Sequence, residues 1–364
     1  MKVNRFELFK KFELLLPAVG FNAMLPEFQR FRISGSTISA TDGALQVVTF
    51  LNVDLGFSCS VPAKAFFDIL ASLKEEEVTI ELDRETKNLV LQTPKTKANF
   101  ASVPYKAIPE INPVGTPWSK ETLPGGIPVF LEKLAFCQTC VSKDETAGVW
   151  CGVLLDREYL LASDKYRVCR SKYINLFEGA VPEPFSIPIK FIDLMKKHED
   201  KIDLFGLGDE GRKVFVIFKD GTLIATPVYT GEYQPLDRFF PGEDVEFRVI
   251  DPSPEILEAI DRHSIFLNGL ASVDRDITVE YRDKKCIISS NIDQVGSLVE
   301  VFVAGADWNI TFYVNPSFFN DANQKMSTPR EGEAPGTQCI RYFTDQGHIL
   351  SIRGDDEYLI TPRT

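Results

Sequence analysis

The side chains that most often carry catalysis or hold a metal are few in this sequence and are scattered along it. Its three histidines, His198, His263 and His348, are isolated and form none of the His-x-x-x-His or His-Glu-x-x-His spacings that put two ligands on one helix face. No Gly-x-Ser-x-Gly nucleophile elbow and no Walker loop occurs either. The sequence therefore predicts no catalytic residue, no metal site and no cofactor, and a protein that is not an enzyme.

One glycine motif matches the sequence pattern of a dinucleotide-binding site but is not followed by the helix that such a site needs. Gly206-Leu-Gly-Asp-Glu-Gly211 matches the Gly-x-Gly-x-x-Gly pattern, which binds a pyrophosphate only where a helix begins directly after it. The run that follows, Val214-Phe-Val-Ile-Phe218, is β-branched and aromatic and predicts a strand. We therefore predict a glycine-rich hairpin turn at this position.

Two of the cysteines form a short motif, and we interpret both as residues packed in the core. Seven cysteines, an odd number spread from Cys59 to Cys339, predict no disulfide framework. Cys137-Gln-Thr-Cys140 is a Cys-x-x-Cys pair, but a zinc site needs a second pair, and a redox site needs a helix start after a strand. Both cysteines fall inside a predicted amphipathic helix, so we expect small buried hydrophobic residues in a reducing compartment.

Charged residues are unevenly distributed. The net charge of −12 argues, taken alone, against a nucleic acid partner. An acidic exterior can nevertheless coexist with a local basic surface, and many of the lysines fall on or beside predicted helices. They are Lys10, Lys11, Lys64, Lys74, Lys133, Lys143, Lys190, Lys196 and Lys197. The alternative is a set of ordinary solvated helix faces. Acidic runs such as Asp355-Asp356 stand at predicted turns, where we expect solvated loops.

The elements that carry these residues form a pattern that repeats. Residues 60–83 predict strand, helix and strand: Pro62 suits a first helical turn, apolar residues follow at helical spacing, and alternation begins at Val78. The same pattern returns around Pro188, 126 residues after Pro62, and more weakly from Phe312. A period of this length indicates tandem domains rather than a solenoid.

Other landmarks keep the same spacing. Ala40-Thr-Asp-Gly43, Ala162-Ser-Asp-Lys165 and Ser289-Ser-Asn-Ile292 follow strand-like runs in each third of the chain, and each third opens with a helical pattern. We therefore predict an α+β protein of three similar domains, residues 1–123, 124–243 and 244–364, each with two helices packed on antiparallel sheets. Asp42 and Asp164 are equivalent in this scheme, which favours a structural turn role over acids that converge in an active site.

Composition is consistent with packed domains. Apolar residues make up 44% of the 364 residues, and no apolar run approaches the roughly 20 residues of a membrane span. The first residues lack the apolar core of a signal peptide, so we expect a cytoplasmic protein.

In the order and spacing of these motifs the chain resembles the bacterial DNA polymerase sliding clamp, the β subunit of DNA polymerase III, in a bacterial, phage or prophage version. The resemblance covers nearly the whole chain. It includes Ser60-Val-Pro-Ala-Lys64 in the first third, Ala162-Ser-Asp-Lys-Tyr-Arg167 in the second, and Gly231-Glu-Tyr-Gln-Pro-Leu-Asp-Arg-Phe-Phe-Pro241 before the third.

The resemblance implies a ring made by a head-to-tail homodimer that encircles double-stranded DNA. Helices would line the hole and present lysines to phosphates without reading bases, and such contacts are sensitive to salt. DNA polymerase and clamp-loader subunits would insert a short peptide into a cleft between the second and third domains. These implications describe a DNA replication processivity factor.

Carried over position by position, the resemblance implies a peptide cleft and a dimer interface. The cleft residues are Trp150, Ser163, Tyr166, Arg167, Val168, Pro241, Leu359, Ile360, Thr361 and Pro362. The interface residues are Phe100, Ile265, Phe266 and Leu267. Lys165 replaces a family glycine and Thr361 a methionine, so we expect a more polar pocket. Ordinary packing is the alternative for each cleft residue, and a three-domain β-rich virion or carbohydrate-binding protein is the alternative for the whole chain.

Overall fold

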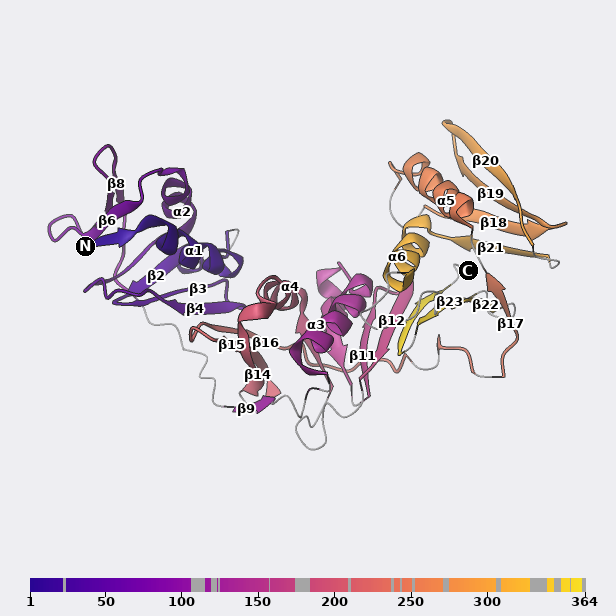
Figure 1. The fold of residues 1–364 in the computed structure, drawn as a ribbon, viewed down its shortest axis with the longest axis horizontal. Coiled ribbons are helices and arrows are strands. Elements are labelled where there is room, and N and C mark those ends of the chain that lie inside the picture. The colour runs from indigo at the N-terminus through magenta and orange to yellow at the C-terminus, as the bar shows by residue number, and fades with distance from the viewer. Residues whose placement is uncertain are drawn as a thin grey trace. The chain divides into compact units, whose positions relative to one another are not determined.

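The computed structural model describes most of the chain (Figure 1). The described residues are 1–21, 24–105, 115–118, 123, 125–156, 158–173, 184–208, 211–236, 239–242, 244–250, 253–270, 275–305, 309–327, 339–343, 348–353 and 355–361. Among them, no helix is long and apolar enough to cross a membrane.

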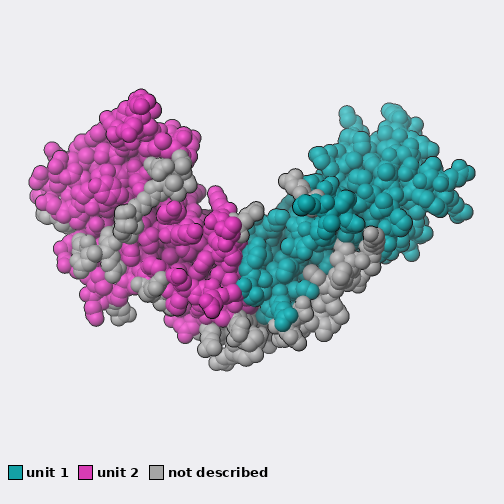
Figure 2. Space-filling view, turned by 180° about the vertical axis from the view of Figure 1, so that it is seen from behind, with its two compact units in different colours: residues 1–131, 177–183, 187–230 teal, residues 132–176, 184–186, 231–364 magenta. Residues whose placement is uncertain are grey.

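The chain divides into two compact units, coloured separately in Figure 2. Unit 1 comprises residues 1–131, 177–183 and 187–230, and unit 2 comprises residues 132–176, 184–186 and 231–364. This division into two units does not test the three domain ranges inferred from the repeats, which stay a prediction.

Six helices lie in the described residues, and they fall where the repeats predict them. Their bounds are α1 Arg5–Leu15, α2 Ala63–Ser72, α3 Gly126–Cys137, α4 Ile189–Lys197, α5 Pro254–Phe266 and α6 Pro316–Ser327. The start signals are satisfied by side chains: Asn4 accepts from the amides of Phe6 and Glu7, and Ser253 accepts from the amide of Ile256.

Unit 1 contains one long and one short antiparallel sheet. The long sheet has the strand order β5-β2-β3-β4-β16-β15-β14-β9 and the short sheet the order β1-β6-β7-β8. The long-sheet strands are β2 Arg30–Ser34, β3 Thr37–Thr41, β4 Gln46–Phe50, β5 Ser58–Pro62, β9 Gly115–Trp118, β14 Ile202–Gly208, β15 Lys213–Phe218 and β16 Leu223–Pro227. The short-sheet strands are β1 Lys2–Asn4, β6 Glu77–Leu82, β7 Leu89–Gln92 and β8 Lys97–Phe100.

The sheet that carries most strands of unit 2 has the order β13-β10-β11-β12-β24-β23-β22-β17, and a shorter one has the order β20-β19-β18-β21. The long-sheet strands are β10 Gly152–Leu155, β11 Tyr159–Ser163, β12 Arg167–Lys172, β13 Phe185–Pro188, β17 Phe247–Ile250, β22 Cys339–Phe343, β23 His348–Arg353 and β24 Asp356–Ile360. The short-sheet strands are β18 Ile277–Arg282, β19 Lys285–Ile292, β20 Gly296–Val303 and β21 Ile310–Val314.

The predicted strand–helix–strand segment is confirmed as β5, α2 and β6, and its second copy as β13, α4 and β14. The third copy supplies β21 and α6. Because Pro62 and Pro188 each precede the first helical residue, the fixed backbone of proline ends the strand and starts the helix at the same place in both copies. Gly208 pairs with Lys213 across the antiparallel strands β14 and β15, as the predicted hairpin requires, and Asp209 and Glu210 of its turn lie outside the described residues.

Aromatic rings fill the space between helices and sheet in unit 1. Phe12 on α1 lies 4.8 Å from Phe66 on α2 and 4.9 Å from Phe31 on β2, measured between ring centroids. All three side chains are fully buried. The apolar stripes recognised in the sequence therefore pack the two helices onto one sheet.

Two expectations about the cysteines are wrong. Helix α3 ends at Cys137, and Cys140 lies in a separate 3₁₀ turn, Gln138–Cys140. Cys140 forms a disulfide with Cys169 on β12. The sequence missed this pairing because the two positions come together only through the packing of the turn on the strand. Cys137 is a buried free thiol, as core packing predicts, and burial raises its pKa.

The expectation of a solvated Asp355-Asp356 turn is also wrong for one of its two residues. Asp356 opens strand β24 and its side chain is 2% exposed, whereas that of Asp355 is 65% exposed. Asp356 accepts a hydrogen bond from the hydroxyl of Ser171 and lies 3.6 Å from the ammonium of Lys133. A buried carboxylate needs such partners, and they come from distant parts of the sequence.

Candidate functional site

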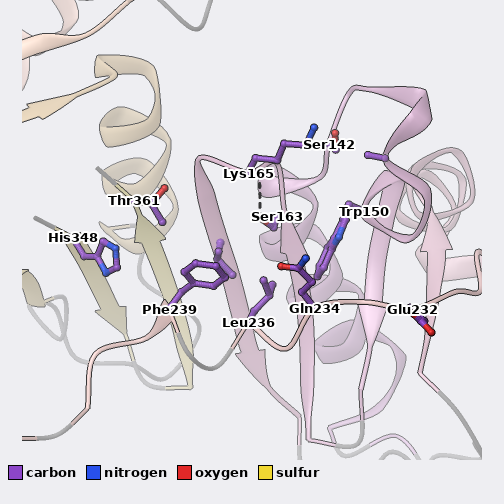
Figure 3. Close-up of a pocket in the computed structure, with 12 residues that line it drawn as sticks. Ser142, Trp150, Ser163, Lys165, Glu232, Gln234, Leu236, Phe239, His348 and Thr361 are labelled. Carbon is purple, nitrogen blue, oxygen red and sulfur yellow. Dashed lines mark hydrogen bonds between the residues drawn. The ribbon is translucent and has the colours of Figure 1, made fainter. Parts of the chain in front are cut away.

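Unit 2 contains a cleft of about 810 Å³ (Figure 3). Strands β11 and β12, the segment between β16 and β17, and the ends of β23 and β24 contribute to it. Its lining residues are Ser142, Ala147, Trp150, Ser163, Lys165, Val168, Glu232, Gln234, Leu236, Phe239, His348 and Thr361.

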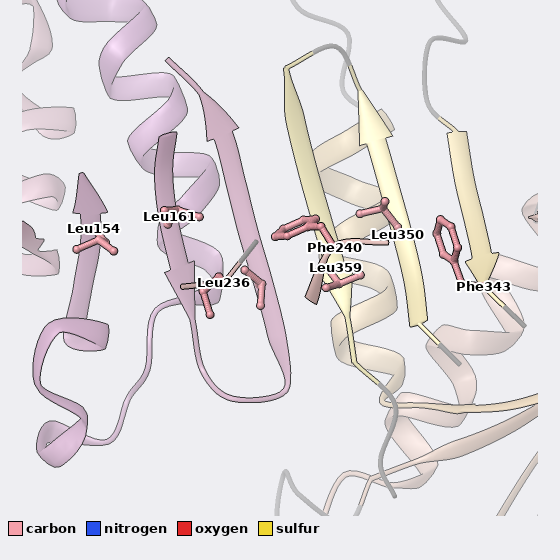
Figure 4. Close-up of a cluster of buried hydrophobic side chains, with 8 residues drawn as sticks. Leu154, Leu161, Leu236, Phe240, Phe343, Leu350 and Leu359 are labelled. Carbon is pink, nitrogen blue, oxygen red and sulfur yellow. The ribbon is translucent and has the colours of Figure 1, made fainter. Parts of the chain in front are cut away.

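The floor of the cleft continues into a buried apolar cluster (Figure 4). Val168 and Leu236 belong to both the cleft and the cluster. The buried members of the cluster are Leu154, Leu161, Val168, Leu236, Phe240, Phe343, Leu350 and Leu359. Trp150, Tyr233 and Phe239 pack against it from the partly exposed side, and the rings of Trp150 and Tyr233 meet edge to face with centroids 6.3 Å apart. The cleft is therefore an apolar, partly aromatic surface on a rigid core.

A tight turn between β11 and β12 shapes one wall. The carboxylate of Asp164 accepts from the amides of Tyr166 and Arg167, both at 3.1 Å, and the amide of Lys165 donates to the hydroxyl of Ser163 at 3.3 Å (Figure 3). Lys165 has a φ of +79°, a conformation in which glycine is less strained. In unit 1, Asp42 accepts from the amides of Ala44 and Leu45 in the same manner. The structural turn role predicted for the two equivalent aspartates is confirmed.

The rim of the cleft is polar. Lys165 and Glu232 are exposed, and the ammonium of Lys165 lies 4.0 Å from the carboxylate of Asp144. Burial lowers the pKa of His348, and a hydrogen bond with the backbone of Phe239 opposes this shift. Among the described residues, the Nδ1 atom of His348 has no hydrogen-bond partner. An apolar floor with hydrogen-bonding groups at the edge suits an extended peptide with large apolar side chains.

The structure brings together some of the ten sequence-predicted cleft residues and not others. Trp150, Ser163, Val168 and Thr361 line the cleft, and Leu359 lies in the cluster under it. Ile360 is buried, and Pro241 is half-buried and not among the lining residues. Pro362 lies outside the described residues.

Tyr166 and Arg167 support the cleft without lining it. The carbonyl of Tyr166 accepts from the amide and the hydroxyl of Thr361, at 2.9 and 2.8 Å, and its ring stacks on that of Phe318. Arg167 is buried and donates to Asp164 at 2.8 Å, to Asp321 at 2.6 Å and to the phenol of Tyr358 at 2.7 Å.

Burial opposes the charge of the Arg167 guanidinium. Its neighbours Tyr358, Asp164 and Asp321 more than offset this, so the pKa of Arg167 is raised above its ordinary value. Arg167 therefore stays charged and holds β12, β24 and α6 together.

Several lining residues were missed by sequence reasoning. Glu232, Gln234, Leu236 and Phe239 belong to the segment 231–241, which was recognised as a motif but not assigned to the cleft. Lys165 was noticed only as a replacement for glycine. Nothing in the sequence singles out Ser142, Ala147 or His348, which reach the cleft through tertiary packing.

The predicted DNA-facing lysines fall into three groups. Lys10, Lys64, Lys74, Lys143, Lys196 and Lys197 are exposed. Lys11 pairs with Asp220 at 2.7 Å, and Lys190 pairs with Asp42 at 2.9 Å while its side chain stays 70% exposed. Lys133 differs from the prediction: it is 7% exposed and donates to the hydroxyl of Ser171 at 3.1 Å, so it does not present its charge to solvent.

The predicted interface residues also differ in exposure. Phe100 is buried at the end of the edge strand β8 and contacts Phe66 with ring centroids 5.3 Å apart, and Leu267 is buried as well. Ile265 is 73% exposed and Phe266 is half-buried. Only the last two therefore have side-chain surface to offer a second copy.

Among the described residues, no group of three or more His, Cys, Asp or Glu side chains could hold a metal ion.

The chain is similar to known proteins in its three-dimensional structure and not in comparisons with family models or curated sequences. No protein-family model and no curated protein sequence matches this chain. The sliding clamp of Bacillus subtilis is 18% identical with a TM-score of 0.80, over 100% of this chain and 98% of that one. The clamp of Caulobacter crescentus is 16% identical with a TM-score of 0.81, over 100% and 99% of the two chains.

A third similar structure is the sliding clamp of Pseudomonas aeruginosa bound to griselimycin, which is 16% identical with a TM-score of 0.77, over 100% of this chain and 99% of that one. From its first strand to its last, this chain has the fold of the bacterial DNA polymerase III β sliding clamps.

Proposed function

We propose that this protein is a DNA sliding clamp, a processivity factor that encircles double-stranded DNA and tethers a replicative polymerase. The observation that carries the proposal is the similarity to solved clamps over the whole chain, at TM-scores of 0.77 to 0.81. A shared fold alone does not imply a shared function, so the site must agree as well. The virion or carbohydrate-binding alternative has no comparable support.

The cleft supports the partner side of this proposal. Trp150, Val168 and Leu236 form an apolar surface next to hydrogen-bonding groups such as Gln234. Short peptide segments of polymerase and clamp-loader subunits would bury large apolar side chains there. Because the floor belongs to a packed cluster, the cleft exists before the peptide arrives, which reduces the ordering cost of binding.

Exposed lysines on the helices support the DNA side. Lys10, Lys196 and Lys197 would attract backbone phosphates without reading sequence. Such contacts can remain weak, because a closed ring is held on DNA by its topology. Weak contacts also permit sliding.

The edge strands support a head-to-tail homodimer. Strand β8 ends the short sheet of unit 1, and strand β20 ends the short sheet of unit 2. Strand β20 exposes the apolar side chains Val299, Val301 and Val303, which suits burial against a second copy. We propose a cytoplasmic, non-enzymatic homodimer with this edge, Ile265 and Phe266 at its interface.

A threading experiment tests encirclement without any knowledge of the loader or polymerase. The protein is incubated with a linear duplex that carries biotin at both ends, and streptavidin is added either before or after the protein. We expect complexes that survive a high-salt wash only when the ends are blocked after binding, since a ring enters and leaves by the ends. Equal salt resistance in both orders would reject the ring.

Native mass measured across a concentration series is the companion experiment. A mass of twice 40.9 kDa, together with a scattering profile that requires a central hole, is expected. A monomer at every concentration would leave the fold intact and remove the mechanism.

A further inference from the structure

The disulfide of unit 2 lies directly behind the wall of the cleft. Cys140 ends the 3₁₀ turn Gln138–Cys140, and Cys169 belongs to β12. Cys169 follows Val168, which lines the cleft, and Cys140 stands two positions before Ser142, which lines it as well. Both bridged cysteines are fully buried. The bridge therefore joins two parts of the cleft wall from behind.

The segment after Cys140 is a loop, residues 141–151, which we call the cleft loop. It leads from the 3₁₀ turn into β10 and contributes the lining residues Ser142, Ala147 and Trp150 (Figure 3). The amide of Ser142 donates to the carbonyl of Trp150 at 2.9 Å, so the two ends of the loop lie together. The disulfide anchors the first end to β12, and β10 continues from the second.

Hydrogen bonds inside the cleft loop give it a shape of its own. The carboxylate of Asp144 accepts from the amide and the hydroxyl of Thr146, at 3.0 and 2.6 Å. The thiol of Cys151 donates to the carbonyl of Asp144 at 3.1 Å. These contacts join loop residues to one another, so they do not fix the position of the loop on the sheet.

Polar contacts between the cleft loop and the sheet are weaker than the bridge. The hydroxyl of Ser186 on β13 donates to the carbonyl of Val149 at 2.5 Å. The ammonium of Lys165 lies 4.0 Å from the carboxylate of Asp144, and both side chains are exposed, so this pair contributes little. The covalent link to β12 is therefore the one whose loss would most free the first end of the loop.

The other cysteines whose side chains the structure describes are free thiols. Cys59, Cys137 and Cys286 are buried and Cys151 is partly exposed. Burial raises the pKa of Cys59 and that of Cys286 to about 11, so both stay protonated and unreactive at neutral pH. A single bridge among reduced thiols suits the proposed cytoplasmic location if the bridge is reversible, because cytosolic disulfides are mostly transient or redox-sensing.

Opening the bridge requires a dithiol reductant. One thiolate of the reductant attacks a sulfur of the bridge and forms a mixed disulfide, and its second thiolate then displaces the protein thiol. Two electrons and two protons pass to the bridge, which leaves thiols on Cys140 and Cys169 and a cyclic disulfide on the reductant. Because both sulfurs are buried, the 3₁₀ turn must open first, so we expect the exchange to be slow.

We propose that the Cys140–Cys169 bridge is a redox switch for the cleft. When closed, it fixes the cleft loop on β12 and the cleft is ready to bind. When open, it leaves the loop to be ordered by the ligand, which lowers the affinity. The control of the loop stands on the contacts described above, whereas the effect on peptide binding rests on the proposed clamp function.

The side chain of Trp150 reports on the cleft loop directly. The full chain is labelled with fluorotryptophan, and the fluorine NMR signal of Trp150 is assigned with Trp150→Phe. We expect this signal to shift or broaden when dithiothreitol opens the bridge, while the signal of Trp118 in unit 1 stays unchanged. Alkylation of two additional cysteines shows that the bridge has opened. An unchanged Trp150 signal after opening, or a bridge that stays closed at equilibrium with excess dithiothreitol, would overturn the switch.

Two variants check that the response comes from this bridge. Cys140→Ala/Cys169→Ala should show the Trp150 signal of the reduced wild type with and without dithiothreitol. Cys151→Ser is the matched control, because it removes a free thiol next to Trp150 and keeps the bridge, so it should respond as the wild type does. A response that persists in the double variant would refute the assignment. If that variant does not fold, the reduced wild type and Cys151→Ser carry the test.

Peptide affinity in the two redox states tests the consequence for binding. The probe is a fluorescein-labelled peptide with leucine and phenylalanine side chains, which suit the apolar floor, and anisotropy gives its affinity. We expect binding to the reduced protein to be about fivefold weaker, the cost of ordering roughly one more side chain. Equal affinities would overturn the link between bridge and binding. No binding in either state, with a Trp150 signal that follows the bridge, would remove the peptide function and keep the switch of the loop.

Discussion

The guanidinium of Arg167 donates to the phenol of Tyr358 at 2.7 Å and joins β12 to β24 in the middle of the second long sheet. Both side chains are buried, and Asp164 and Asp321 complete the group. Substituting Arg167→Met should lower the free energy of unfolding by about 3 kcal/mol, because it leaves the largely buried carboxylate of Asp164 without its cation. Urea unfolding measures this loss.

The exposed Arg282 provides the matched control for that substitution. It pairs with Glu280 and its side chain is 56% exposed, so Arg282→Met should change the unfolding free energy by less than about 1 kcal/mol. Equal losses of unfolding free energy in the two variants would show that the buried ion pairs of Arg167 contribute no more to stability than the exposed pair of Arg282.

A charge placed on the cleft floor should abolish partner binding. Trp150→Asp puts a carboxylate where a peptide side chain would be buried, so we expect the affinity for clamp-binding peptides to fall at least about tenfold, together with polymerase stimulation. Isothermal titration with peptides from candidate polymerases measures the effect, and native mass should be unchanged. Tyr313→Asp, at an aromatic residue 59% exposed outside the cleft, is the control and should bind normally.

The two interface residues with exposed side chains should control assembly. Ile265→Asp and Phe266→Asp are expected to convert the dimer into a folded monomer, because a buried carboxylate without a partner opposes association. Phe100→Asp should instead unfold unit 1, since Phe100 packs on Phe66 inside one chain. Native mass and circular dichroism separate the two results. A dimer that survives both surface substitutions would place the interface elsewhere.

His263 should make the protein less stable in acid. Its side chain is fully buried and its Nδ1 atom lies 2.7 Å from the hydroxyl of Ser290, and burial lowers its pKa despite the opposing charge of Glu300. Below about pH 6.5 the unfolded state therefore binds a proton that the folded state does not, and stability falls by up to about 1.4 kcal/mol per pH unit until the lowered pKa is reached. His263→Gln should remove this component of the pH dependence of unfolding between pH 7 and 5. An identical pH profile in the variant would contradict the assignment.

The disulfide between Cys140 and Cys169 should be detectable and stabilising. Alkylation of the denatured protein should modify two fewer cysteines without reductant than with it. Replacing both cysteines with alanine should lower the unfolding free energy by about 3 kcal/mol, because the bridge closes a loop of 29 residues in the unfolded chain. Cys59→Ala, at a free buried thiol, is the control for cavity effects, and full alkylation without reductant would refute the bridge.

Periodicity predicted the fold well because it reports on burial. The stripe on α1 and the proline starts of α2 and α4 lie where the sequence placed them, since each depends on residues within a few positions of one another. The equivalence of Asp42 and Asp164 was also visible, because an aspartate turn forms its hydrogen bonds locally.

Long-range pairings could not be inferred in the same way. The burial of Lys133 depends on Ser171 and Asp356, and the disulfide depends on the packing of a turn against β12. His348 reaches the cleft from a strand start that has no distinguishing sequence signal. Of the residues that the resemblance to clamps predicts for the cleft, Trp150, Ser163, Val168 and Thr361 line it, and the rest of the lining depends on tertiary contacts.

In each long sheet the two middle strands, β4 with β16 and β12 with β24, come from distant parts of the chain, and these two junctions differ in strength. In unit 1, β4 pairs with β16 over three residue pairs, from Gln46 to Val48, and the hydroxyls of Thr49 and Thr222 meet beside it at 2.6 Å. In unit 2, β12 pairs with β24 over five residue pairs, and the Arg167 group reinforces them. If the chain is pulled by an external force, we expect the β4–β16 strand pair to separate before the β12–β24 pair, because it has fewer residue pairs. The chain would then yield inside unit 1 while the sheet beneath the cleft stays whole.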